Sequence, residues 1–101
     1  MARELIVSSR ADADLSEAFE WYESRLPGLG VDFVRRVDAA LQLVQRSPQM
    51  FRRRRGAMRM AMTTRFPYAI YFIWDEASDR ISVRRALHYA QDSSAHLRSD
   101  S

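Results

Sequence analysis

The sequence contains no cysteine and no lysine, and only three glycines and three prolines among its 101 residues. Without cysteine, neither a disulfide framework nor a thiolate metal site is available, and this absence fits a reducing compartment. No apolar run approaches the roughly 20 residues that a membrane-spanning helix needs, and the first residues alternate charge with hydrophobe where a signal peptide would be continuously apolar. We therefore expect a cytoplasmic protein with no membrane contact.

Arginine supplies all the basic side chains of the chain. Sixteen arginines exceed thirteen acidic residues, so the net charge is +3 and the sequence pI is about 9.9. A genome rich in G and C would give the same bias, but arginine is also the side chain that binds phosphate and carboxylate in bidentate fashion. Acidic residues gather between residues 12 and 23, and arginines concentrate after residue 50. This asymmetry predicts one acidic face and one basic face.

Hydrophobic periodicity predicts a strand, two helices and three further strands, forming one domain over residues 1–92 with a polar, flexible tail at 93–101. The expected ranges are 3–7 for the first strand, 10–26 and 31–45 for the helices, 49–56 for a loop, and 58–63, 65–75 and 80–88 for the later strands. This β-α-α-β-β-β order gives an α+β fold, in which an antiparallel helical hairpin packs on one face of a sheet that contains a three-stranded antiparallel meander. The first strand could pair in either direction.

The stretch 65–75 (RFPYAIYFIWD) predicts the strand around which the sheet is built. Successive side chains point to opposite faces of a strand. One face would carry Tyr68, Ile70, Phe72 and Trp74, and the other would carry Ala69, Tyr71 and Ile73. Because both sets are apolar, this strand belongs in the middle of the sheet.

Three finer expectations concern the ends and faces of these elements. Ser9, followed three residues later by Asp12, predicts the N-cap of the first helix. The buried stripe of that helix would consist of Ala11, Leu15, Ala18, Phe19, Tyr22 and Leu26, with Trp21 at its edge. In the last strand, one face would carry Ile81, Val83 and Leu87, and Arg85 would interrupt it.

Several short motifs follow one another along the chain. They are D-L-x-E-A-x-x-[WY]-Y from Asp14 to Tyr22, P-G-L-G from Pro27 to Gly30 followed by Phe33, S-P at Ser47 and Pro48, F-P-Y-x-I-x-[YF] from Phe66 to Phe72, and the late His88. No single motif is specific, but in this order and spacing they resemble the RelE/ParE toxins of bacterial toxin–antitoxin pairs, in particular the ParE branch. The resemblance covers about residues 5–92.

The resemblance implies one of two activities. RelE-type toxins cut messenger RNA on the ribosome without a metal, using basic side chains on the sheet together with a tyrosine or histidine near the C-terminus. ParE-type toxins inhibit DNA gyrase, with no established catalytic residue of their own. Both types are neutralised by a cognate antitoxin, and neither requires a cofactor.

Tyr68 favours the ParE branch. The third strand of the ribonuclease branch commonly reads R-[LIV]-[VI]-Y, where the arginine contacts the scissile phosphate. With the last tyrosine of that motif aligned on Tyr71, Tyr68 stands where the arginine belongs. A phenol with a pKa near 10 carries no positive charge at neutral pH, so it cannot supply the electrostatic stabilisation that arginine would. We therefore expect a gyrase inhibitor without catalytic residues.

His88 and Tyr89 favour the alternative, a ribosome-dependent messenger RNA endoribonuclease. Adjacent histidine and tyrosine near the C-terminus resemble the acid and base that some ribonuclease members use. The catalytic residues would then be drawn from His88, Tyr89, Arg59, Arg65, Arg84 and Arg85. A histidine that closes the last strand through backbone hydrogen bonds is the structural alternative.

The run of four arginines is the expected contact surface for the antitoxin or the target. A charge run of this kind is commonly just a solvated loop, but an antitoxin must cover a basic or apolar face of the toxin to silence it. The residues expected to make this contact are Arg52, Arg53, Arg54, Arg55, Arg59 and Trp21.

Overall fold

Strand β4 (Tyr68–Asp75) lies inside a five-stranded sheet, as its two apolar faces predict. The protein is described here by a computed structural model over residues 3–89, so the predicted tail at 93–101 and the predicted domain end at residue 92 lie outside the described residues. The other elements are β1 (Glu4–Val7), α1 (Ser9–Arg25), α2 (Leu29–Arg46), a 3₁₀ turn (Pro48–Met50), β2 (Arg53–Arg55), β3 (Met58–Met62) and β5 (Arg80–His88).

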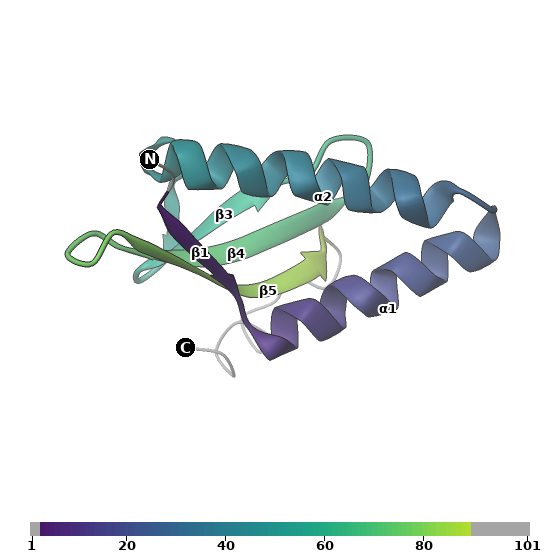
Figure 1. Ribbon diagram of the computed structural model, residues 1–101, viewed down its shortest axis with the longest axis horizontal. Coiled ribbons are helices and arrows are strands. Elements are labelled where there is room, and N and C mark those ends of the chain that lie inside the picture. The colour runs from purple at the N-terminus through teal and green to yellow at the C-terminus, as the bar shows by residue number, and fades with distance from the viewer. Residues whose placement is uncertain (1–2, 90–101) are drawn as a thin grey trace.

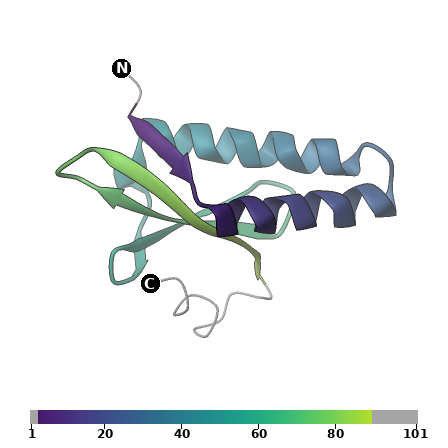
Figure 2. The same ribbon diagram turned by 60° about the horizontal axis from the view of Figure 1, so that its bottom comes forward.

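The sheet has the order β1-β5-β4-β3-β2 (Figure 1). Strands β2 to β5 form an antiparallel meander, and β1 pairs with β5 in parallel, which settles the direction that the sequence left open. The helices lie side by side on one face of the sheet (Figure 2). The predicted α+β class, with a helical hairpin on one sheet face, is confirmed.

Both faces of β4 are buried as predicted. Ile70 and Phe72 join the core under the helices, together with Phe33 of α2 and Tyr22 of α1. Ala69 and Tyr71 belong to a second apolar cluster on the opposite face. Alternation alone gave these assignments, because a strand has only two faces.

The range 49–56 is not a loop, as the sequence predicted, because it contains the edge strand β2. Arg55 pairs with Met58 across a tight turn in which Gly56 has a φ of +54°, a left-handed conformation that favours glycine. The strand could not be predicted from the sequence, because three consecutive arginines show no alternation of apolar and polar residues. The meander therefore has four strands where three were expected.

Two further expectations on α1 are wrong. Ser8, not Ser9, is the N-cap, and its Oγ accepts a hydrogen bond from the Ala11 amide at 3.1 Å. The same hydroxyl donates to the Arg84 carbonyl of β5, a long-range contact that no local pattern encodes. Leu26 is 59% exposed, since the helix ends at Arg25 and the chain has already turned away from the core.

The helical hairpin closes through Glu23 of α1. Its carboxylate accepts hydrogen bonds from the Gly28 and Gly30 amides, both at 2.9 Å, and so caps the N-terminus of α2. Gly28 has a φ of +93°, which allows the sharp turn. Neither helix within residues 3–89 has the length and apolarity needed to cross a membrane.

Candidate functional site

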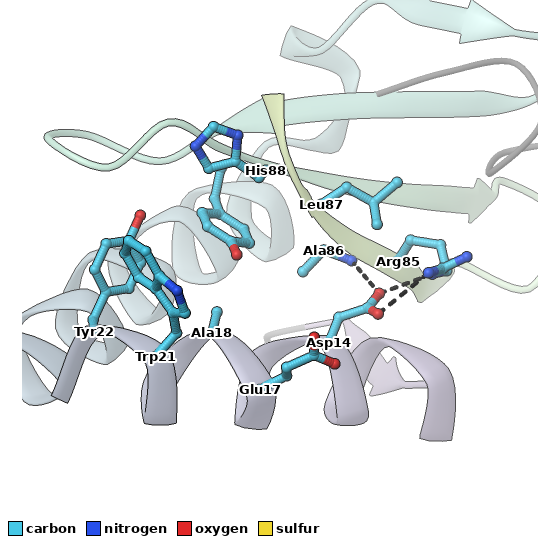
Figure 3. Close-up of a pocket in the computed structure, with 10 residues that line it drawn as sticks. Asp14, Glu17, Ala18, Trp21, Tyr22, Arg85, Ala86, Leu87 and His88 are labelled. Atoms are coloured by element: carbon cyan, nitrogen blue, oxygen red, sulfur yellow. Dashed lines mark hydrogen bonds and ion pairs between the residues drawn. The ribbon is translucent and has the colours of Figure 1, made fainter. Parts of the chain in front are cut away.

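A cavity of about 400 Å³ lies between α1 and the C-terminal part of β5 (Figure 3). Carboxylates, aromatic rings and the last strand residues surround it. Its lining consists of Asp14, Glu17, Ala18, Trp21, Tyr22, Tyr68, Arg85, Ala86, Leu87 and His88. These residues come from α1, β4 and β5, so the cavity exists only after the helix has docked on the sheet.

A bulge in β5 shapes the floor of the cavity. Tyr71 of β4 pairs with Arg85, but the next residue, Phe72, pairs with Val83, so Arg84 is an extra residue in β5. The bulge reverses the alternation beyond Val83. Leu87 consequently packs in the second cluster with Tyr71, and the prediction that Leu87 shares a face with Val83 is wrong.

Asp14 fixes this bulge from α1. Its carboxylate accepts from Arg85 Nε at 2.8 Å and Nη2 at 3.3 Å, and from the Ala86 amide at 3.0 Å. The Asp14 and Arg85 side chains are only 17% and 9% exposed, so this ion pair is largely shielded from water. The arginine charge is therefore neutralised inside the protein.

Aromatic rings form the other wall of the cavity. The Tyr68 and His88 rings meet edge to face with centroids 5.5 Å apart, and Tyr22 lies 6.1 Å from Tyr68. Burial raises the pKa of the Tyr68 phenol, and the nearby Tyr22, Glu17 and Asp14 raise it further. Burial also raises the pKa of Tyr22. The cavity thus opposes the appearance of negative charge on its phenols.

The raised tyrosine pKa values predict an alkaline loss of stability. Because both folded-state values lie above the ordinary 10.0, the unfolded chain releases these protons first as the pH rises. Their contribution to stability is complete below pH 10 and is lost as the pH rises through the folded-state values. Urea titrations at increasing alkaline pH should show this fall, and Tyr22→Phe or Tyr68→Phe should flatten it. Tyr89→Phe, at an exposed position, is the control. Equal slopes in all variants would contradict the assignment.

The arginines predicted for a ribonuclease do not gather around His88. Arg59 donates to the Phe51 carbonyl at 2.6 Å and lies 5.5 Å from the Trp74 ring. It pairs with Phe72 on β4, whereas His88 pairs with Tyr68, four residues away. At about 3.3 Å per residue, the two positions are roughly 13 Å apart along the strand.

The other candidates are also dispersed. Arg65 lies in the turn before β4, with its guanidinium 3.7 Å from the Asp32 carboxylate of α2. Arg84 occupies the bulge and lies 3.5 Å from the Ser82 hydroxyl. Tyr89 follows β5 and is 57% exposed. Only His88 and Arg85 of the predicted catalytic set line the cavity.

The predicted contact residues occupy two separate places. Arg53 to Arg55 are exposed along the edge strand β2, and Arg52 is exposed just before it. Arg53 lies 3.9 Å from Glu76. Arg59 is turned inward, with a side chain only 12% exposed. Trp21 lies at the cavity, 53% exposed, with the Arg25 guanidinium 4.3 Å from its ring centroid.

Sequence reasoning missed the acidic character of the cavity. Asp14 and Glu17 belong to the motif of the first helix, but their spacing on α1 does not indicate which strand they face. Their three-residue interval does place them on one side of the helix. Within the described residues, no three His, Cys, Asp or Glu side chains come together as a metal site requires.

A second cavity of about 380 Å³ follows the groove between α1 and α2. Its lining includes Leu15, Phe19, Phe33, Val34, Val37 and Leu41, with Asp12, Glu20 and Asp38 among the polar residues. It contains none of the predicted site residues.

The fold is shared with solved toxin–antitoxin structures. No protein-family model and no curated protein matches the sequence. One chain of the chromosomal ParDE toxin–antitoxin system of P. aeruginosa matches with a TM-score of 0.73 and 18% identity, over 85% of this chain and 95% of that chain. A chain of the toxin–antitoxin complex RelBE2 of Mycobacterium tuberculosis matches with a TM-score of 0.54 and 18% identity, over 87% and 99%. The chain therefore has the RelE/ParE toxin fold that its motifs predict.

Proposed function

We propose that this protein is the toxin of a type II toxin–antitoxin pair, that it acts in the cytoplasm as a ParE-like inhibitor of DNA gyrase, and that a cognate antitoxin neutralises it. The motifs from Asp14 to His88 and the fold shared with ParDE and RelBE2 chains support the toxin assignment. The choice of gyrase over the ribosome depends on the surroundings of His88.

The charge around His88 is the observation that carries this choice. Metal-free RNA cleavage requires a base, an acid and cations placed around the phosphate. Among residues 3–89, the acidic and basic side chains that line the cavity beside His88 are Asp14, Glu17 and Arg85, and Arg85 is ion-paired with Asp14. A phosphate would meet Glu17 and the Tyr68 phenol there, where a nuclease needs arginine. Inhibition by binding fits this arrangement better than phosphodiester cleavage.

A supercoiling assay tests the gyrase proposal. Purified protein added to gyrase, relaxed plasmid and ATP should block supercoiling, and relaxation by a type I topoisomerase should continue as the control. Addition of the antitoxin, sought in the neighbouring reading frame as a short acidic protein, should restore supercoiling. Full gyrase activity at a large excess of the protein would exclude the proposal.

The ribonuclease alternative retains one favourable observation. His88 and Tyr68 are in ring contact at the edge of a cavity, and both side chains can transfer protons. Mapping transcript 5′ ends after induction of the gene separates the two activities. Codon-phased cuts in translated messages would establish the nuclease, and intact messages would exclude it.

The edge strand β2 is the proposed contact for an acidic part of the antitoxin. Arg52 to Arg55 are exposed, and exposed edge strands offer backbone groups for pairing with another chain. An acidic extended segment could pair with β2 and neutralise its arginines. The same charges protect an unpartnered edge from aggregation, which is their structural role in the free protein.

A further inference from the structure

We propose that the cavity between α1 and β5 receives a cationic side chain, arginine or lysine, from a partner polypeptide. It combines carboxylates, phenol oxygens and an indole in one hollow of about 400 Å³. Each of these groups attracts a cation by a different physical interaction. The proposal goes beyond gyrase inhibition. It rests on the proposed function only where it identifies the partner polypeptide as the antitoxin.

Among residues 3–89, the side chains that line the cavity include two carboxylates and one guanidinium, and the Arg25 guanidinium lies outside the lining, against the Trp21 ring. Asp14 and Arg85 compensate each other at 2.8 Å, which leaves the Glu17 carboxylate as the excess charge. Glu17 is exposed, and within residues 3–89 it makes no ion pair or hydrogen bond. Burial is the main cause of the raised pKa of the Tyr68 phenol, and the charges of Glu17 and Asp14 raise it further because both carboxylates lie near this ring.

Two phenol oxygens add acceptors to these carboxylates. Tyr22 is 8% exposed and Tyr68 is half-buried, and within residues 3–89 neither hydroxyl makes a hydrogen bond. Neither oxygen is fully buried, so a ligand in the cavity can reach both. A guanidinium has five N–H donors and no acceptor, so it can donate to both phenols and to Glu17.

The Trp21 ring completes the preference for a cation. Its face already attracts the Arg25 guanidinium, which lies 4.3 Å from the ring centroid. Figure 3 shows Trp21 and Tyr22 projecting from α1 toward the end of the strand that carries His88. Aromatic faces attract ammonium and guanidinium groups through the ring quadrupole.

The partner reaches the cavity with a side chain and not by adding a strand. Pairing between β1 and β5 ends at Val83. Beyond Val83, the Ser8 hydroxyl donates a hydrogen bond to the Arg84 carbonyl, and the Asp14 carboxylate accepts one from the Ala86 amide. Side chains therefore already occupy the backbone groups at this edge of β5. Under the proposed function, the antitoxin is the polypeptide that supplies the cation.

A titration with a minimal ligand tests the cavity independently of gyrase and antitoxin. The probe is Nα-acetyl-arginine methylamide, and its neutral isostere built from citrulline is the control. We expect saturable shifts of the Trp21 indole N–H signal with the arginine probe only. The Trp74 indole, which donates to Asp79 elsewhere on the sheet, is the internal control and should not move.

Glu17→Gln should weaken the arginine probe roughly twofold to fivefold, the range of one exposed charge pair. Glu20→Gln removes an exposed acid one turn away that does not line this cavity, so it should leave the affinity unchanged. Saturable binding of the citrulline probe with equal affinity, absence of saturation, or equal loss in the two variants would overturn the proposal. A negative gyrase assay would leave these results unaffected, so the two failures are distinguishable.

Discussion

Replacing Asp14 with leucine is expected to lower the free energy of unfolding by about 3–5 kcal/mol, the usual cost of removing one partner of a buried ion pair. The substitution removes the carboxylate that accepts two hydrogen bonds from Arg85 and one from the Ala86 amide. The Arg85 charge would remain 9% exposed without this carboxylate. Urea unfolding followed by circular dichroism measures the change.

The matched control is the ion pair between Glu4 and Arg80. Its nitrogen and oxygen lie 2.7 Å apart, as close as those of the buried pair, but the side chains are 52% and 62% exposed. Glu4→Gln should therefore cost less than about 1 kcal/mol, because water screens the pair and solvates each partner alone. Similar losses in both variants would show that burial does not decide the strength of the Asp14 interaction.

The sequence predicts best those features that depend on one element at a time. The two faces of β4 follow from period-two alternation of its apolar residues, and the helical hairpin follows from the three- and four-residue spacing on either side of Pro27. Strand β5 was located at 80–88, where the structure has it. These assignments need no knowledge of which elements meet.

Features that depend on contacts between two distant elements cannot be predicted from the residue pattern of either element alone. The bulge at Arg84 leaves only an ambiguous local signal: Arg85 interrupts the apolar face of Ile81 and Val83, but Leu87 returns to the same alternation. Asp14 holds the bulge from across a gap of about seventy positions in the chain. Strand β2 likewise forms because β3 is available for pairing, and its three arginines show no strand pattern.

The candidate site was predicted from the sequence only in part. His88 and Trp21 were singled out from the sequence, and both line the cavity. The predicted catalytic arginines were not brought together, because strand register places Arg59 far along β4 from His88. Glu17 gains its importance from the docking of α1 beside β5, which the helix periodicity does not specify.

Replacing Gly30 with alanine should destabilise the protein by about 1–3 kcal/mol, the usual cost of overpacking a close contact. A Cβ atom at this position would lie 2.8 Å from the Phe19 carbonyl oxygen and 2.9 Å from the Glu23 carboxylate. The carboxylate can rotate away, but the carbonyl belongs to the backbone of α1, so the helices would have to separate. Such a separation would also lengthen the hydrogen bond from the Gly30 amide to Glu23.

Whether Gly30→Ala raises or lowers the free energy of unfolding distinguishes an effect of packing from an effect of helix propensity. Alanine is more favourable than glycine by about 0.5–1 kcal/mol in a helix interior, and by no more than this in the first turn, where Gly30 lies. Propensity alone therefore gives no reason for Gly30→Ala to destabilise the protein. The reverse substitution at the exposed Ala39 of α2 measures that propensity in the same helix and should cost about this amount. Thermal and urea unfolding of both variants decide the matter. A gain in stability for Gly30→Ala would mean that the two helices adjust at no cost, whereas a loss identifies Gly30 as the residue that permits their close approach.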